Sequence, residues 1–149
     1  MPAMQKIAPF LWFDGDMEEA VKFYVSVLPD SRVTSINPMS ASFVLCGVEF
    51  MGLNGGPMFK FTEALSLFVK CEDQAEVDLY WNAFLEHGGT ESQCGWLKDK
   101  YGLSWQIIPN ALGRYMSDPD RAKANRVMQA MLQMKKIVVA ELDAAAAAS

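Results

Sequence analysis

Apolar residues along the chain follow two periods, one typical of strands and one typical of helices. Residues 6–13 read KIAPFLWF, an apolar run that predicts a strand, with Pro9 at an edge or a bulge because proline donates no ladder hydrogen bond. Apolar side chains at helical spacing then predict a helix that begins at Asp14 or Asp16 and ends at Pro29. Strands are predicted next, the last two as a hairpin, over residues 31–36, 41–47 and 48–54.

The second half of the chain repeats this order. Residues 65–71 predict a strand, and residues 72–89 predict a helix whose acidic start, Asp73, corresponds to Asp16 of the first half. Residues 93–109 read QCGWLKDKYGLSWQIIP, which predicts two strands joined by a charged turn. The pattern therefore predicts two βαβββ modules.

The pattern becomes helical after the second module. Asn110 can cap a short helix, and Asp118 followed by Pro119 predicts the start of a longer one. The alanine-rich tail, residues 144–149, is expected to fray.

These elements predict an α+β fold for the whole chain. We expect the two βαβββ modules to form a curved mixed, mostly antiparallel sheet with helices outside, plus a C-terminal helical extension. A single domain over residues 1–149 would then contain module one at about 6–57, module two at about 64–109 and C-terminal helices at about 110–143.

Charge and cysteine content narrow the function classes. The net charge of -5 argues against nucleic acids and anionic membranes as partners, since both attract basic surfaces. No apolar run approaches the roughly 20 residues that span a bilayer, and the first ten residues lack the apolar core of a secretion signal. Cys46, Cys71 and Cys94 lie far apart without metal-binding spacing, which indicates reduced thiols and a cytoplasmic location.

Aromatic and polar residues supply the candidate binding groups. Trp12, Trp96 and Trp105 are predicted on strands, where they could line a cavity or pack within the sheet. Asn54 and Gln106 could contact a ligand, although hydrogen bonds within the protein are the favoured interpretation.

Residues in and near the charged turn have simpler interpretations. Cys94 could act as a nucleophile with a lowered pKa, but the pattern favours a small side chain that fills the strand interior. Lys98, Asp99 and Lys100 are predicted to form a solvated turn, with Asp99 able to cap it. His87, the only histidine, is expected to be exposed at a helix end.

Four segments resemble one protein family. They read PFLWFDGDMEEAVKFY, LNGGPMFKF, CGWLKDKYGLSWQIIP and DPDRAKANRVMQAMLQMKKI. They are similar to the PhnB-like branch of the vicinal oxygen chelate superfamily, which includes glyoxalase I, bleomycin resistance proteins and extradiol dioxygenases. Members of this branch are often labelled 3-demethylubiquinone-9 3-methyltransferase, and the resemblance spans residues 6–137.

The resemblance implies the fold above and a ligand site enclosed by the sheet. The usual metal-ligand positions of the superfamily fall near Pro9, Gly52, Ser66 and Gln106, and only Gln106 offers a side chain that could bind a metal. We therefore expect no metal and no cofactor.

The expected function is binding of an unidentified small molecule by a homodimer, with unknown catalytic residues. The alternative is an enzyme with an atypical metal or none, including the methyltransferase of the label. The candidate pocket residues are Trp12, Asn54, Cys94, Trp96, Trp105 and Gln106.

Overall fold

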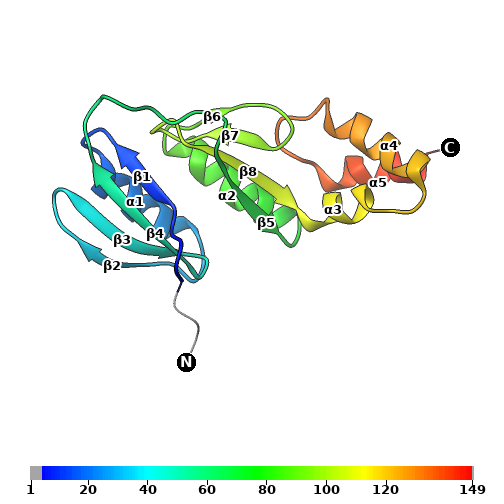
Figure 1. Cartoon of the computed structure of the whole chain (residues 1–149). Helices are drawn as coiled ribbons and strands as arrows, with labels where there is room; N and C mark the ends of the chain where they lie inside the picture. The colour runs from blue at the N-terminus through cyan, green and yellow to red at the C-terminus, as the bar shows by residue number, and fades with distance from the viewer. Residues whose placement is uncertain (1–4, 149) are drawn as a thin grey trace. The chain divides into compact units, whose positions relative to one another are not determined.

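The computed structural model describes residues 5–148 and contains two compact units that divide between Phe61 and Thr62. Figure 1 labels the strands and helices of both units. The first unit contains β1 (Phe10–Phe13), α1 (Met17–Val27), β2 (Arg32–Ile36), β3 (Ser40–Leu45) and β4 (Val48–Asn54). The second unit begins with β5 (Ser66–Cys71), α2 (Gln74–Glu86), β6 (Thr90–Glu91), β7 (Trp96–Lys98) and β8 (Ser104–Pro109). It ends with α3 (Asn110–Met116), α4 (Arg121–Met131) and α5 (Val139–Ala147).

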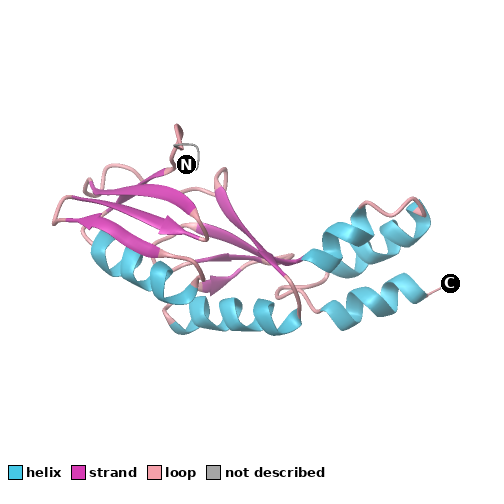
Figure 2. Ribbon diagram, turned by 90° about the horizontal axis from the view of Figure 1, so that it is seen from below, coloured by secondary structure: helices cyan, strands magenta, loops and turns pink. Residues whose placement is uncertain are grey.

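The first unit is a four-stranded sheet with α1 on one face (Figure 2). The strand order is β1-β4-β3-β2, in which β1 pairs parallel with β4 and the other pairs are antiparallel. Strand β1 begins at Phe10, later than the sequence predicts, and Pro9 precedes it with a carbonyl that accepts from Met51 N. The β3–β4 hairpin turns at Cys46 and Gly47, which both have positive φ, as a two-residue hairpin turn of this type requires.

The second unit repeats this arrangement with the order β5-β8-β7-β6. Strand β5 pairs parallel with β8, and the remaining pairs are antiparallel. Helix α2 packs with its apolar side against one face of the sheet, where the Phe84 ring lies 4.7 Å from that of Trp105. Its start at Asp73 is confirmed, because the Asp73 carboxylate accepts from Glu76 N.

The C-terminal helices form an apolar cluster of their own with the end of β8. Its buried members are Ile108, Leu112, Val127, Met134, Ile137 and Leu142. The predicted start of α4 at Asp118 is two residues too early, because the carboxylate of Asp120, not that of Asp118, accepts from Lys123 N. The expected fraying of the tail is corrected for residues 144–147, which belong to α5, whereas Ser149 lies outside the described residues.

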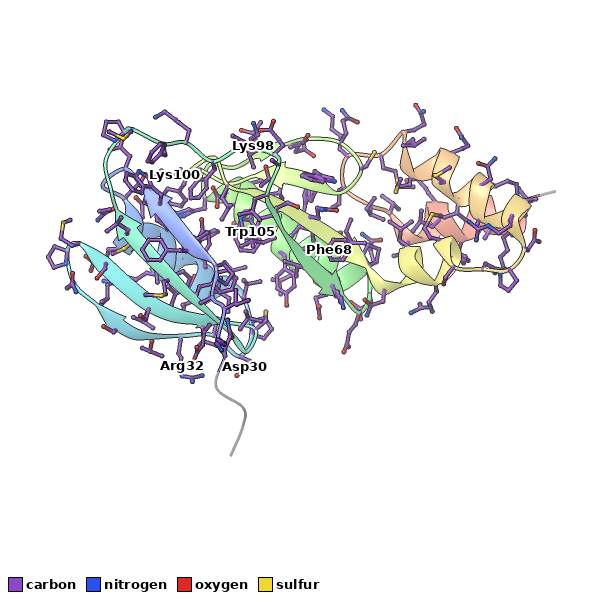
Figure 3. All side chains as sticks on the ribbon, viewed as in Figure 1. Asp30, Arg32, Phe68, Lys98, Lys100 and Trp105 are labelled. Atoms are coloured by element: carbon purple, nitrogen blue, oxygen red, sulfur yellow. The ribbon has the colours of Figure 1, made fainter. Side chains whose placement is uncertain are left out.

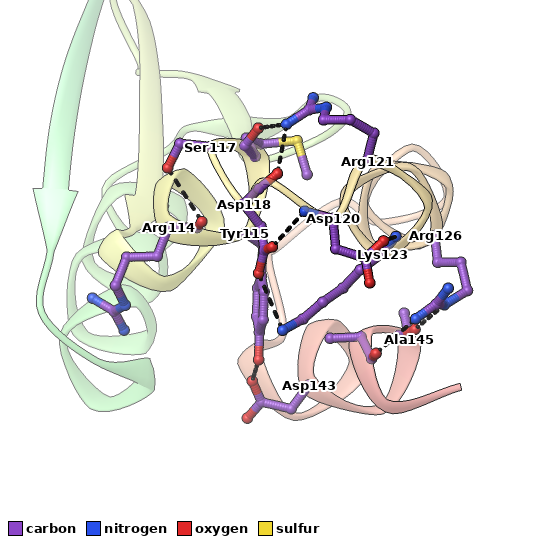
Figure 4. A network of polar contacts seen from close by, with 12 residues as sticks. Arg114, Tyr115, Ser117, Asp118, Asp120, Arg121, Lys123, Arg126, Asp143 and Ala145 are labelled. Carbon is purple, nitrogen blue, oxygen red and sulfur yellow. Dashed lines mark hydrogen bonds and ion pairs between the residues drawn. The ribbon is translucent and has the colours of Figure 1, made fainter. Parts of the chain in front are cut away.

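Polar contacts hold α3, α4 and α5 together at the surface (Figure 4). Tyr115 Oη donates to Asp143 Oδ1 over 2.5 Å, and the Arg126 guanidinium donates to two carbonyls at the end of α5. The Tyr115–Asp143 hydrogen bond raises the pKa of Tyr115. The pKa of Asp118 is lowered because its carboxylate accepts from Asp120 N and pairs with Lys123 at 3.1 Å.

Backbone hydrogen bonds of residues 134–139 connect these helices to the rest of the second unit. Cys94 N donates to Met134 O over 2.8 Å, and Gly95 N donates to Lys135 O over 2.7 Å. The Gln74 side chain on α2 donates to Ile137 O and accepts from Val139 N. The C-terminal helices are therefore an integral part of the second unit.

The predicted α+β fold with two βαβββ modules and a C-terminal helical extension is confirmed, with a separate hydrogen-bonded sheet in each module. That the whole chain forms a single domain with the predicted module boundaries stays a prediction. No helix within residues 5–148 combines the length and apolar character needed to cross a membrane.

Candidate functional site

The second sheet has one face covered by α2 and one face open. Side chains alternate along a strand, so Leu97, Trp105 and Ile107 point toward α2 and are almost fully buried. Phe68 on β5 and Gln106 on β8 are register partners that point to the open face (Figure 3 labels Phe68 and Trp105). The open face keeps Phe68 53% exposed, which leaves apolar surface available for contact.

A cavity of about 350 Å³ lies on this open face. It is lined by Phe68, Cys94, Trp96, Gln106, Ile108, Leu112, Gly113, Met116 and Met131. The sheet and the segment just before β7 provide one wall, and α3 and the end of α4 provide the other. The lining is mostly apolar and contains no charged side chain, which is typical of a pocket for a small apolar molecule.

Gln106 is the main polar group of this cavity. Its Nε2 donates to Ser66 Oγ over 2.9 Å, and Ser66 lies on the neighbouring strand β5. Ser104, two residues before Gln106 on the same face, has a buried Oγ without a hydrogen-bond partner within residues 5–148. The Gln106–Ser66 pair therefore lies beside the apolar cavity, whereas Ser104 is buried.

Three of the six predicted candidates come together here: Cys94, Trp96 and Gln106 line the same cavity. Cys94 has a φ of 58°, in the left-handed region that non-glycine residues seldom adopt. The hydrogen bond from its backbone N–H to Met134 O accompanies this conformation and places Cys94 between β7 and the C-terminal helices.

Trp105 lies on the side of β8 that faces the core, where its indole packs and donates a hydrogen bond. Its ring is 1% exposed, and its Nε1 donates to Asp99 Oδ2 over 3.0 Å. Asp99 Oδ1 also accepts from Tyr101 N and Leu103 N. The prediction of a solvated turn is wrong for Asp99, which is only 5% exposed and caps the turn from inside the fold.

His87 is another correction to the sequence interpretation. It is partly buried, and its Nε2 lies 2.9 Å from Tyr101 Oη. His87 therefore ends α2, as predicted, but it contacts the turn that follows β7 and is not fully exposed.

Trp12 and Asn54 belong to the first unit. Trp12 Nε1 donates to Gly56 O over 2.9 Å, and its ring meets that of Phe59 edge to face. Asn54 Oδ1 accepts from Met17 N over 3.0 Å, and its Nδ2 donates to Pro38 O. Asp16 is the N-cap residue of α1, as one of the two predicted starts, but its side chain makes no cap bond. Asn54 on β4 supplies the acceptor instead.

We expect Asn54→Ala to lower the free energy of unfolding by about 1–2 kcal/mol, because it removes the acceptor at the start of α1. Urea denaturation followed by circular dichroism measures this change. Asp16→Ala is the matched control and should change stability by less than about 0.5 kcal/mol, since Asp16 makes no cap bond. Equal effects of the two substitutions would contradict the assignment of the cap to Asn54.

The first unit also has a cavity, of about 470 Å³. Its lining includes Lys6 and Glu49. None of the six pocket residues predicted from the sequence lines it. The Gln5 amide in this lining is already bonded, since it donates to Glu49 O and accepts from Glu49 N. This cavity is therefore more polar than the one on the second sheet.

The positions expected to hold a metal in the superfamily do not fit one in this chain. A Cβ on Gly52 would lie 3.3 Å from Met17 Cγ, so this position faces α1. Ser66 and Gln106 do meet, but a hydroxyl and an amide are weak ligands for a divalent ion. Within residues 5–148, no three or more His, Cys, Asp or Glu side chains gather into a possible metal site.

Comparisons with known proteins support the architecture. The family model for 3-demethylubiquinone-9 3-methyltransferase matches residues 5–108. No curated protein matches the chain.

Three solved structures illustrate the likeness. A PhnB protein from Bacillus cereus is 36% identical, with a TM-score of 0.65, and the match covers 70% of this chain and 99% of that one. A glyoxalase-related enzyme from Fulvimarina pelagi is 17% identical, with a TM-score of 0.56, over 73% of this chain and 91% of that one. The fosfomycin resistance protein FosX from Mesorhizobium loti is 14% identical, with a TM-score of 0.52, over 69% and 90%. Helices α3, α4 and α5 lie beyond the residues that the family model matches.

Proposed function

Since the chain belongs to the 3-demethylubiquinone-9 3-methyltransferase family, the PhnB-like branch of the vicinal oxygen chelate superfamily, we propose that it binds a small, largely apolar molecule on its second sheet. The proposed site is the cavity lined by Cys94, Trp96 and Gln106 together with α3 and α4. Binding there needs no metal.

One observation carries this proposal: a cavity large enough for a small molecule has an apolar lining and a single amide to orient its occupant. Trp96 and Phe68 provide flat aromatic surfaces. Met116 and Met131 provide flexible thioethers that can adapt to a ligand and contact aromatic rings favourably. The chemistry suits an aromatic ligand with one group that can hydrogen-bond to Gln106.

We expect Gly113→Leu to weaken ligand binding at least about tenfold without lowering stability. Gly113 lines the cavity on α3, and a Cβ there meets no atom within 4 Å, so the larger side chain can enter the space that the ligand needs. Replacing glycine within a helix should raise stability by roughly 0.5–1 kcal/mol. Titration calorimetry with 2-naphthamide, chosen after a thermal-shift screen of aromatic compounds, measures the affinity.

The control is Ala122→Leu, which enlarges an exposed side chain on α4 that does not line the cavity. It should leave the affinity for 2-naphthamide unchanged. A Gly113→Leu variant that binds as tightly as the wild-type protein would place the ligand elsewhere and overturn the proposed site.

We also propose that the chain acts as a homodimer. Exposed apolar side chains on the first sheet, such as Phe10 and Met51, support this proposal because contact with a second copy would bury them. Light scattering at micromolar concentration tests it, and a monomer mass would reject it.

The second candidate function is an enzyme, and the family description as a methyltransferase is the observation that favours it. Saturable thermal stabilisation by S-adenosylmethionine, with transfer of its methyl group to a quinone-like acceptor, would support this function. Absence of stabilisation at millimolar S-adenosylmethionine would reject it.

A further inference from the structure

A second, smaller hollow adjoins the proposed cavity along β5 and β8. It measures about 230 Å³ and is lined by Phe68, Lys70, Ile108, Pro109, Asn110 and Gly113. Three of these residues, Phe68, Ile108 and Gly113, also line the proposed cavity, so the two hollows share a wall. An occupant of the larger hollow can therefore extend into the smaller one.

The smaller hollow brings in the one charged side chain of the combined lining, Lys70. Lys70 follows Phe68 by two strand positions, so both point to the open face and the Lys70 Cα lies about 7 Å farther along β5. Phe68 is the register partner of Gln106, and Lys70 is the partner of Ile108. The ammonium group and the Gln106 amide therefore lie near opposite ends of one apolar surface.

Lys70 differs from the other cation on this face in having no counter-ion. Lys98 Nζ lies 2.6 Å from Glu63 Oε1, and this contact lowers the pKa of Glu63. Within residues 5–148, the Lys70 side chain makes no ion pair or hydrogen bond. The unpaired ammonium beside an apolar groove is complementary to a ligand that joins an apolar body to an anionic group.

We propose that the natural ligand is a small aromatic carboxylate, with its rings in the larger hollow and its carboxylate at Lys70. This inference rests on the proposed function, because it concerns the same cavity. The carboxylate keeps partial contact with water at the exposed Lys70 side chain, so the negative charge need not be fully desolvated. The aromatic body contacts Phe68, Trp96 and the methionines, none of which carries charge.

The test compares 2-naphthoate with 2-naphthamide, which have the same rings and differ mainly in charge. Titration calorimetry at low salt should show the wild-type protein binding 2-naphthoate roughly three- to tenfold more tightly. Lys70→Met keeps the apolar stem and removes the charge, so it should abolish this preference without weakening 2-naphthamide. Lys135→Met, an exposed lysine of the same unit that lines neither hollow, should retain the preference.

Salt dependence gives a second measurement that needs no variant. Raising the ionic strength from about 0.02 M to about 0.5 M should reduce the preference of the wild-type protein for the acid, because salt screens an exposed ion pair. Equal affinities for the two compounds at low salt, or a preference that persists in Lys70→Met, would overturn the carboxylate inference while leaving the cavity as a ligand site. If the wild-type protein binds neither compound, or Gly113→Leu leaves both affinities unchanged, the proposed function itself fails and the inference fails with it.

Discussion

Asp99→Ala is expected to lower the free energy of unfolding by about 3–5 kcal/mol, because it leaves buried donors without an acceptor. The Asp99 carboxylate accepts from two backbone N–H groups and from the Trp105 indole, and each of these bonds is 2.9–3.0 Å long. Alanine can replace none of them, and Trp105 lies in the core against Phe84. Urea denaturation followed by near-ultraviolet circular dichroism reports both the stability and the packing of the indole.

Two further variants test whether the stability loss comes from the buried hydrogen bonds of Asp99, rather than from the loss of any capping carboxylate. Asp99→Asn keeps the shape and one acceptor oxygen, so its loss should be smaller than that of Asp99→Ala. Asp120→Ala removes an exposed carboxylate that accepts one backbone N–H at the start of α4, and it should cost about 1 kcal/mol. If Asp99→Ala costs no more than Asp120→Ala, the three hydrogen bonds of Asp99 do not stabilise the turn as argued.

Gly95→Ala is expected to destabilise the protein by about 2–5 kcal/mol. Gly95 has a φ of +85°, and a Cβ there would lie 2.5 Å from Ile108 Cδ1 and 3.0 Å from Ile137 Cγ1. The positive φ costs about 1–2 kcal/mol for a side-chain residue, and overpacking adds roughly 1–3 kcal/mol. Because Ile108 lines the cavity and Ile137 belongs to the cluster of C-terminal helices, the clash acts where β7, β8 and these helices meet.

Gly102→Ala is a closely matched control for this substitution. Gly102 has nearly the same backbone conformation, with a φ of +90°, but no atom lies within 4 Å of a Cβ placed there. It should therefore cost only the backbone strain of about 1–2 kcal/mol. Thermal and urea denaturation of both variants measure the difference, and equal losses would show that the packing around Gly95 can relax to admit a methyl group.

The elements whose signals are local agree well with the structure. The two strand-like segments around Gly47 predicted the β3–β4 hairpin, and Asp73 predicted the start of α2, where its carboxylate makes the cap bond. The two strands and charged turn of residues 93–109 are also present as β7 and β8. These features depend on residues a few positions apart, so the sequence contains the whole signal.

The starts of α1 and α4 show where local reasoning was insufficient. Two aspartates precede each helix, and the local sequence does not show which side chain accepts the hydrogen bond at the helix start. At α1 the acceptor is Asn54, which is 37 residues from Met17 in sequence and reaches it only because β4 lies beside the start of the helix. At α4 the Asp118 carboxylate accepts from Asp120 N instead, and Asp120 provides the cap.

The βαβββ repeat, the family and the apolar character of the strands around Trp96 and Gln106 can all be inferred from the amino-acid sequence. Which of their side chains meet depends on the tertiary structure, because parallel pairing of β5 with β8 sets Phe68 opposite Gln106 and turns Trp105 into the core. The tertiary structure also places Met116 and Met131 at the cavity, where they form part of its second wall. The physical reason is that periodicity specifies which face of an element is apolar, whereas strand register and helix docking, which join residues far apart in the chain, specify what that face contacts.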